Sequence, residues 1–339
     1  MNRKNFLEAS AAVLTATYIP ALAAPGHIDK PEFIAPPVLR NGDIIGITAP
    51  AGYITNEEIQ PAVKKIESWG YQVRIGETIG KRDFTFGGTD EERAKDFQQM
   101  LDDPKIRAIM CARGGYGAVR IIDKLNWEKF KVKPKWIIGF SDITVFHSHL
   151  NKNLGIASIH SKMCNSFPDD WSLAEPMQIQ TIEAIQQALS GVKMKYALDA
   201  NPSNKLGTAE GVLIGGNLKT LESLSGTKSD INTTGKILFV EDTGEYMYSI
   251  DRMFWNLKRT GKLSRLNGLV VGGFKIKVDE DADDFGRTLQ DVVLEKIKGN
   301  SYPVCFDFPV GHQKNNYALK CGVNHRLSVS ADVVTLKEI

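Results

Sequence analysis

Cysteine is scarce in this sequence of 339 residues. Its four cysteines are widely spaced and form no Cys-x-x-Cys pair: Cys111, Cys164, Cys305 and Cys321. This spacing excludes a small disulfide-stapled scaffold and gives no cysteine-based metal motif. We expect the four thiols to be buried mainly as small hydrophobic side chains.

An excess of charge of either sign is also missing. The 42 Lys and Arg residues nearly balance 40 Asp and Glu residues, and no long basic run stands out. Proteins that bind nucleic acid usually carry a clustered basic patch, because phosphate contacts supply much of their affinity. The composition therefore predicts no nucleic-acid partner. A hydrophobic content of 42% and a charged content of 24% are typical of a soluble globular protein.

Long apolar runs are missing except near the N-terminus. Arg3 and Lys4 precede a mostly apolar stretch over residues 6–24, and Ala21-Leu22-Ala23 has the small-x-small form that signal peptidase reads. This pattern predicts a signal peptide over residues 1–24, export to the periplasm and no stable membrane insertion after processing. A membrane anchor fits less well, because polar residues and a proline interrupt the run: Glu8, Ser10, Thr15, Thr17 and Pro20. The export route stays open, since only one arginine of a twin-arginine signal is present.

Short apolar runs alternate with amphipathic segments of helix length from residue 43 onward. We expect strands at residues 44–48, 71–75, 106–111 and 136–140, with helices over 56–69 and 89–101. Such alternation predicts a parallel sheet covered by helices. The predicted organisation is an N-terminal domain over residues 37–165, a linker over 166–206 with one helix near 177–189, and a C-terminal α/β domain over 207–339.

The most informative segment is Gly139-Phe140-Ser141-Asp142. An apolar strand ends in a glycine and a serine, and an acid then opens a helix-like segment. A strand-to-helix turn of this kind lifts a hydroxyl out of the fold, so Ser141 is a candidate nucleophile. The alternative is that Ser141 only caps the helix, with Asp142 stabilised by the positive end of the helix dipole.

Three further motifs carry groups that chemistry could use. Arg113-Gly114-Gly115-Tyr116-Gly117 follows a strand and either cradles an oxyanion or phosphate, or only forms a turn, since its spacing fits no nucleotide motif. Glu241 ends an apolar strand, where it either orients a histidine or is simply solvated. His312 lies in a loop and is either functional or polar surface.

A metal site has weaker support. His147, His149, His160 and Cys164 are ligand types, but an i, i+2 pair on a helix points to different faces. The acidic segment 279–284 lacks both the central glycine and the final glutamate of a calcium-binding loop. We therefore predict no metal and no cofactor.

Read together, the motifs resemble those of the LD-carboxypeptidase family of serine peptidases, over about residues 37–330. The residues that carry the resemblance occur in the family's order: Arg113-Gly114-Gly115-Tyr116-Gly117, Gly139-Phe140-Ser141-Asp142, Gly215-Gly216-Asn217-Leu218, Val240-Glu241-Asp242, Ile250-Asp251-Arg252-Met253 and Pro309-Val310-Gly311-His312. The resemblance implies a parallel-sheet N-terminal domain similar to class I glutamine amidotransferases and flavodoxins, with a smaller mixed α/β C-terminal domain.

The resemblance also implies a catalytic triad with Ser141 as nucleophile, His312 as general base and Glu241 orienting the imidazole. Backbone N–H groups of Asp142 and of the Gly114-Gly115 turn would form the oxyanion hole. Arg113 is the candidate for the substrate carboxylate.

The expected reaction is release of the terminal D-Ala from a murein tetrapeptide stem. Three alternatives are a peptidase of the same family that hydrolyses a peptide-nucleotide antibiotic as self-immunity, a catalytically silent peptidoglycan-binding relative, and a periplasmic solute-binding protein without catalysis. The last has no use for the serine, histidine and glutamate set. The sequence is also compatible with a homodimer.

Overall fold

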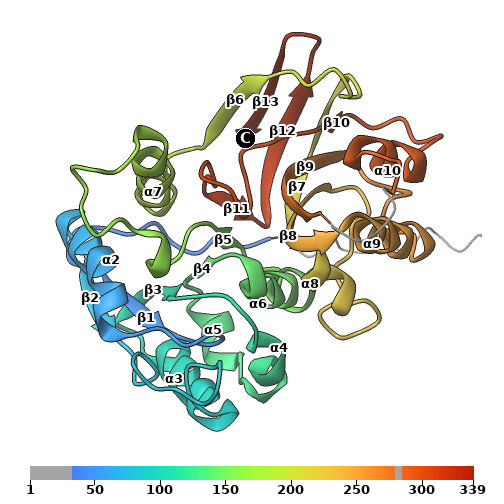
Figure 1. Ribbon diagram of the computed structural model, residues 1–339. Helices are drawn as coiled ribbons and strands as arrows, with labels where there is room; N and C mark the ends of the chain where they lie inside the picture. The colour runs from blue at the N-terminus through green and yellow to red at the C-terminus, as the bar shows by residue number, and fades with distance from the viewer. Residues whose placement is uncertain (1–32, 279–284) are drawn as a thin grey trace, which may run out of the picture. The chain divides into compact units, whose positions relative to one another are not determined.

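Two sheets organise residues 33–278 and 285–339, which are the residues that this computed structural model describes (Figure 1). The first has the strand order β11-β5-β4-β3-β1-β2, and the second has the order β10-β9-β8-β7-β12-β13-β6. The predicted α/β class, with a parallel-dominated N-terminal sheet and a second sheet in the C-terminal region, is confirmed. The predicted signal peptide at residues 1–24 lies outside the described residues.

The first sheet is built from the alternating segments that the sequence indicates. The strands β1 to β5 run parallel to one another and are β1 (Ile44–Thr48), β2 (Gln72–Ile75), β3 (Ile106–Cys111), β4 (Trp136–Gly139) and β5 (Ser158–His160). The helices in this half are α2 (Asn56–Ser68), α3 (Asp90–Asp102), α4 (Ala118–Ile121), α5 (Glu128–Val132) and α6 (Thr144–His149). Because parallel strands end at one edge of the sheet, the loops after β3 and β4 are neighbours.

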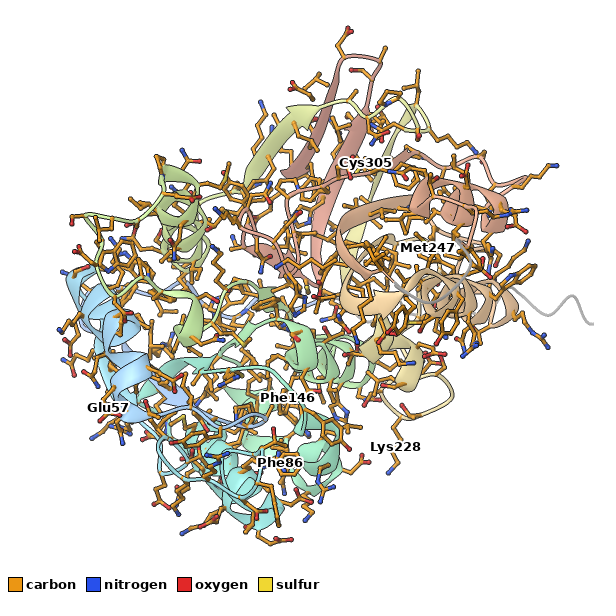
Figure 2. All side chains as sticks on the ribbon, in the orientation of Figure 1. Glu57, Phe86, Phe146, Lys228, Met247 and Cys305 are labelled. Atoms are coloured by element: carbon orange, nitrogen blue, oxygen red, sulfur yellow. The ribbon has the colours of Figure 1, made fainter. Side chains whose placement is uncertain are left out.

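Helix α3 shows how the local sequence sets these elements. Thr89 accepts a hydrogen bond from the backbone of Glu92, whose side chain bonds back to the Thr89 backbone, and this capping box starts the helix. Phe97 and Met100 lie on its buried face. Phe97 stacks on Phe146 of α6 at 4.6 Å between ring centroids, and Figure 2 shows Phe146 among the side chains that fill this half of the molecule. Burying such aromatic rings fixes α3 and α6 against the sheet.

The second sheet combines parallel and antiparallel strands. Its parallel part contains β7 (Gly207–Asn217), β8 (Ile237–Tyr246), β9 (Gly268–Lys277) and β10 (Val304–Cys305), and its antiparallel part contains β12 (Val323–Val329), β13 (Val333–Glu338) and β6 (Lys195–Asp199). The helices here are α8 (Leu218–Ser223), α9 (Met247–Arg259) and α10 (Leu289–Lys296).

The segment 166–206 contains the expected helix, α7 (Pro176–Leu189), and also the strand β6. Strand β6 pairs with β13 at the edge of the second sheet, and Tyr196 is its only fully buried residue. A short edge strand with one buried side chain has little apolar periodicity, which is why the sequence pattern does not indicate it.

One strand connects the two sheets. β11 (Leu319–Cys321) pairs antiparallel with β5 of the first sheet, as Figure 1 shows. The chain then turns at Gly322, whose N–H donates to the carbonyl oxygen of Leu213 in the second sheet at 2.7 Å. One hydrophobic cluster of the core contains residues of both sheets, among them Ile45 and Phe239. The C-terminal half of the chain therefore completes the N-terminal sheet.

The four cysteines are buried and unpaired, as expected. Within residues 33–278 and 285–339, no helix has the length and apolar character that a bilayer span requires.

The turn between β4 and α6 has an unusual backbone. Ser141 has φ of +63°, in the left-handed region that residues with a side chain rarely adopt. It begins a short 3₁₀ turn, Ser141–Ile143, that leads into α6. The strain of such a residue persists only where the surrounding structure imposes it.

This strain predicts that Ser141→Gly will be more stable than Ser141→Ala. Glycine has no Cβ to oppose a positive φ, so we expect a difference of about 1 kcal/mol in the free energy of unfolding. Denaturant titration of both variants measures it. Equal stabilities, or a more stable alanine variant, would show that the turn is unstrained.

Candidate active site

Ser141, His312 and Glu241 meet although they lie far apart in the sequence. The Ser141 Oγ is 3.1 Å from His312 Nε2, and His312 Nδ1 is 2.7 Å from Glu241 Oε2. Ser141 follows β4, Glu241 lies in β8, and His312 lies in the loop after β10. The site therefore draws one residue from the first sheet and two from the second half of the chain.

The strand end that carries Ser141 is held from two sides. The backbone N–H of Ser161 donates to the Gly139 carbonyl at 3.1 Å, and His147 Nε2 lies 2.9 Å from the same oxygen. Burial lowers the pKa of His147 to about 4, so its ring is neutral at neutral pH. Nε2 must then be the donor to the carbonyl, while Nδ1 accepts from the Ser158 hydroxyl at 2.8 Å. His147 thus supports the turn before Ser141.

The loop around Gly311 holds His312 against Glu241. Glu241 is fully buried, and its Oε2 also accepts the backbone N–H of His312 at 3.2 Å. Gly311 has φ of +110°, and a Cβ at this position would lie 2.6 Å from the Glu241 Cβ. The Gly311 N–H donates to Asn316 Oδ1 at 2.9 Å. Only glycine lets the backbone approach the carboxylate this closely, so Gly311 sets the His312–Glu241 contact.

The glycine-rich turn after β3 lies beside Ser141. A Cβ on Gly114 would lie 3.1 Å from the Ser141 Cβ and 3.3 Å from its Oγ. The Gly114 carbonyl accepts the N–H of Gly52 at 2.8 Å, and Gly115 has φ of +93°. Arg113 is exposed, and its Nη1 donates to the carbonyl of Tyr53 at 3.1 Å. The predicted oxyanion turn is therefore next to the predicted nucleophile.

The Asp142 side chain links the same two loops. Its Oδ2 accepts the backbone N–H of Ala118, the first residue of α4, at 2.7 Å. Burial raises the pKa of Asp142 to about 6. The carboxylate therefore caps a neighbouring helix and ties the Gly114 turn to the turn of Ser141.

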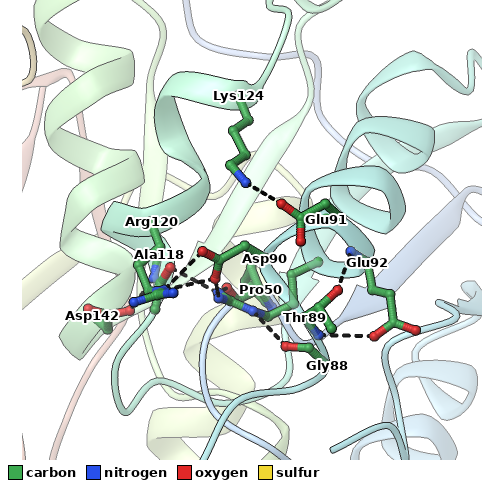
Figure 3. A network of polar contacts seen from close by, with 12 residues as sticks. Pro50, Gly88, Thr89, Asp90, Glu91, Glu92, Ala118, Arg120, Lys124 and Asp142 are labelled. Atoms are coloured by element: carbon green, nitrogen blue, oxygen red, sulfur yellow. Dashed lines mark hydrogen bonds and ion pairs between the residues drawn. The ribbon is translucent and has the colours of Figure 1, made fainter. Parts of the chain in front are cut away.

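A buried arginine that the sequence analysis did not single out holds the loops around the site. Figure 3 shows Pro50, Gly88 and Asp90, three residues that it contacts. Arg93 of α3 donates to the carbonyls of Pro50 at 2.6 Å, Gly117 at 2.9 Å and Gly88 at 3.2 Å, and it pairs with Asp90. Burial lowers its pKa. The sequence contains a signal for this buried cation, because Arg93 lies four positions before Phe97 on the apolar face of α3.

The residues considered for a metal do not converge. His147 bonds to Gly139 and Ser158, while His149 Nδ1 lies 3.0 Å from the Ser229 hydroxyl. Within the described part of the chain, no group of three or more histidine, cysteine, aspartate or glutamate side chains is arranged to hold a metal ion.

The arrangement supports proton transfer from a hydroxyl. A neutral imidazole that donates Nδ1–H to a carboxylate presents its Nε2 lone pair to the serine hydroxyl, which makes the oxygen a better nucleophile. The phenyl ring of Phe140 lies 4.8 Å from the His312 ring, between centroids, and covers one side of it.

Known proteins resemble the chain over nearly its whole length. Residues 45–161 match the LD-carboxypeptidase N-terminal domain and residues 210–327 match the LD-carboxypeptidase C-terminal domain. A probable murein peptide carboxypeptidase of Bacillus subtilis is 31% identical over 304 residues, which cover 89% of this chain and 94% of that protein. A microcin C7 self-immunity protein of Escherichia coli is 27% identical over 321 residues, covering 86% and 91%.

The crystal structure of a muramoyltetrapeptide carboxypeptidase from Oxalobacter formigenes superposes with a TM-score of 0.78 at 29% identity, covering 87% of this chain and 98% of that one. The matches to the two murein carboxypeptidases cover both halves of the chain. The chain belongs to the LD-carboxypeptidase family of serine peptidases and is a hydrolase with carboxypeptidase activity.

Proposed function

We propose that the chain hydrolyses the L-D peptide bond that releases the terminal D-Ala from murein tetrapeptide stems, with Ser141, His312 and Glu241 as its catalytic triad. The observation that carries this proposal is the hydrogen-bonded series from Ser141 Oγ through the His312 ring to Glu241, at 3.1 and 2.7 Å. A serine at its free pKa is a weak nucleophile, so a base at this position has a direct chemical use.

In the proposed mechanism, His312 Nε2 takes the hydroxyl proton as Ser141 Oγ attacks the scissile carbonyl. Glu241 stabilises the imidazolium and keeps Nδ1 protonated. His312 then gives the proton to the amine of the leaving D-Ala, and the acyl group stays on Ser141. A water molecule, deprotonated by His312, hydrolyses that ester and restores the serine.

The developing oxyanion needs donors on the side of Ser141 that faces the glycine-rich turn. We assign the backbone N–H groups of Asp142 and of the Gly114-Gly115 turn to this role, supported by the closeness of Gly114 to Ser141. Such a donor stabilises the transition state by about 3 kcal/mol in enzymes that transfer acyl groups. The Arg93 network supports this geometry, because it fixes Gly117 at the far end of the same turn.

Replacing any residue of the triad should remove most of the activity without unfolding the protein. We expect Ser141→Ala, His312→Ala and Glu241→Gln each to lower kcat by several orders of magnitude, with double variants far from additive, because the three act as a unit. Release of D-Ala from a disaccharide tetrapeptide measures turnover, and circular dichroism checks folding.

Glu245→Gln is the matched control for the choice of carboxylate. Glu245 lies in the same strand and accepts a hydrogen bond from the Ser249 hydroxyl at 2.6 Å, whereas the carboxylate bonded to His312 is that of Glu241. Its loss should leave kcat within a few-fold of the parent. A loss as severe as that of Glu241→Gln would show that the wrong acid has been assigned.

The site should distinguish the two configurations of the leaving residue. A cleft that aligns the scissile carbonyl with Ser141 receives the methyl and carboxylate of that residue in one hand, so inversion brings one of them against the wall. We expect efficient release of D-Ala from the L-D bond of a tetrapeptide. The matching L-L peptide and the D-Ala-D-Ala bond of a pentapeptide should be poor substrates. Comparable rates on the L-L and L-D peptides would contradict the LD specificity.

We also propose that the protein is exported and acts in the periplasm, on the basis of the pattern in residues 1–24. Mass spectrometry of the protein from its native cell should then find a mature N-terminus at or close to Ala24. An intact Met1 in a cytoplasmic fraction would refute export.

The second candidate is hydrolysis of a peptide-nucleotide antibiotic, favoured by the 27% identity to the microcin C7 self-immunity protein. Both functions use the same triad. Parallel assays with the tetrapeptide and with an aminoacyl sulfamoyl nucleoside separate them by their values of kcat/KM.

A further inference from the structure

Lys162 differs from the other buried lysines of residues 33–278 and 285–339. Five lysines there are less than a tenth exposed. Four of them donate to oxygen atoms: Lys135 to the carbonyls of Met100 and Asp103, Lys262 to Asp230, Lys296 to Asp251 and Glu295, and Lys320 to Glu338 and the Val192 carbonyl. The ammonium group of Lys162, whose residue is 7% exposed, has no hydrogen bond or ion pair with any described residue.

The Lys162 Nζ keeps some contact with solvent while its alkyl stem is covered, so an anion that enters from solution can reach it. Burial accordingly lowers the pKa of Lys162 to about 8, with no carboxylate to oppose the effect. The anion of a ligand can supply the partner that the described residues do not provide, and groups with perturbed pKa values are concentrated at functional sites.

The backbone around Lys162 runs along the strand ends that form the candidate active site. The Ser161 N–H donates to Gly139 in β4 at 3.1 Å, and the Asn165 N–H donates to Ala112 after β3 at 3.3 Å. Lys162 therefore lies in a segment that spans the ends of both strands.

The next residue reaches the nucleophile's surroundings. The Cε of Met163 lies 3.2 Å from the position of a Cβ on Gly114, and that position is 3.1 Å from the Ser141 Cβ. Lys162 is thus adjacent in sequence to a side chain that lines the site.

A carboxypeptidase must recognise a free carboxylate near its nucleophile, and a cation is one group that can do so. The free carboxylate of the leaving residue is separated from the scissile carbonyl carbon only by the amide nitrogen and one α-carbon. Arg113, the candidate from the sequence, is exposed and already donates to Tyr53. A buried cation attracts an anion more strongly than an exposed one, because water screens it less.

We propose that Lys162 binds the C-terminal carboxylate of the substrate peptide and so makes the enzyme a carboxypeptidase. This inference rests on the proposed function. In this proposal the substrate carboxylate is the counter-ion of Lys162, which no described residue provides.

The test compares two ligands that differ only at the C-terminus. In the Ser141→Ala background, which cannot turn over, calorimetry measures binding of the tetrapeptide L-Ala-γ-D-Glu-meso-diaminopimelate-D-Ala and of its C-terminal amide. Lys162→Met should weaken binding of the acid at least tenfold and change binding of the amide less than twofold. Equal weakening on both ligands, unchanged affinities, or a selective loss in Arg113→Met instead would overturn the assignment.

Lys236→Met is the matched control. Burial also lowers the pKa of Lys236 to about 8, and its Nζ lies over the Phe33 ring at 5.1 Å. Lys236 precedes β8, whereas Glu241 lies five positions further along the chain, so this ammonium belongs to the other end of the strand. Both ligands should bind this variant as they bind the parent.

Stability and turnover give two independent readouts. Removing an unpartnered charge should leave the Tm of the free protein unchanged or raise it, and a lower Tm for Lys162→Met would show that the ammonium is satisfied within the fold.

Turnover by the wild-type enzyme separates the two proposals. Carboxylate-selective binding through Lys162 without release of D-Ala would refute only the function, release without this selectivity would refute only the role of Lys162, and absence of binding of either ligand would refute both.

Discussion

The pairing of β11 with β5 is the contact on which the rest of the site depends. Leu319 and Cys321 align with His160 and Ser158, so a strand from the end of the chain becomes the edge of the first sheet. His312 lies seven positions before that strand, in the loop that leads to it. A second link joins the halves nearby, where the Asn217 N–H donates to Thr144 Oγ1 at 3.0 Å. These backbone contacts hold a hydrogen bond between residues 171 positions apart.

Much of the fold could be predicted from local pattern. The strands of the first sheet are continuous apolar runs, and capping boxes at Thr55 and Thr89 mark the starts of α2 and α3. Strands β6 and β11 could not be predicted in this way. Each is short, and each is defined by a partner strand more than 100 positions away in sequence, which no local period encodes.

The candidate site could likewise be predicted only in part from the sequence. The structure brings together Ser141, Glu241 and His312, which the sequence motifs single out. The sequence does not show the roles of Arg93 and Lys162: the position of Arg93 on an apolar helix face indicates burial, but neither cation reveals its partners. Their roles depend on what lies opposite them: three carbonyl oxygens face Arg93, and no described acceptor faces Lys162. Asp142 likewise caps α4 and not the helix that follows it, and only the tertiary fold decides that choice.

The late position of β11 also sets the order in which the enzyme is completed during synthesis. A nascent chain that has passed Ser141 contains the proposed nucleophile but neither Glu241, nor His312, nor the last strand of its own N-terminal sheet. Domains generally fold as the ribosome releases them, yet this one stays open at an edge until residues 319–321 emerge. With the proposed triad, a chain that ends before His312 lacks the base, so hydrolysis requires almost the whole polypeptide.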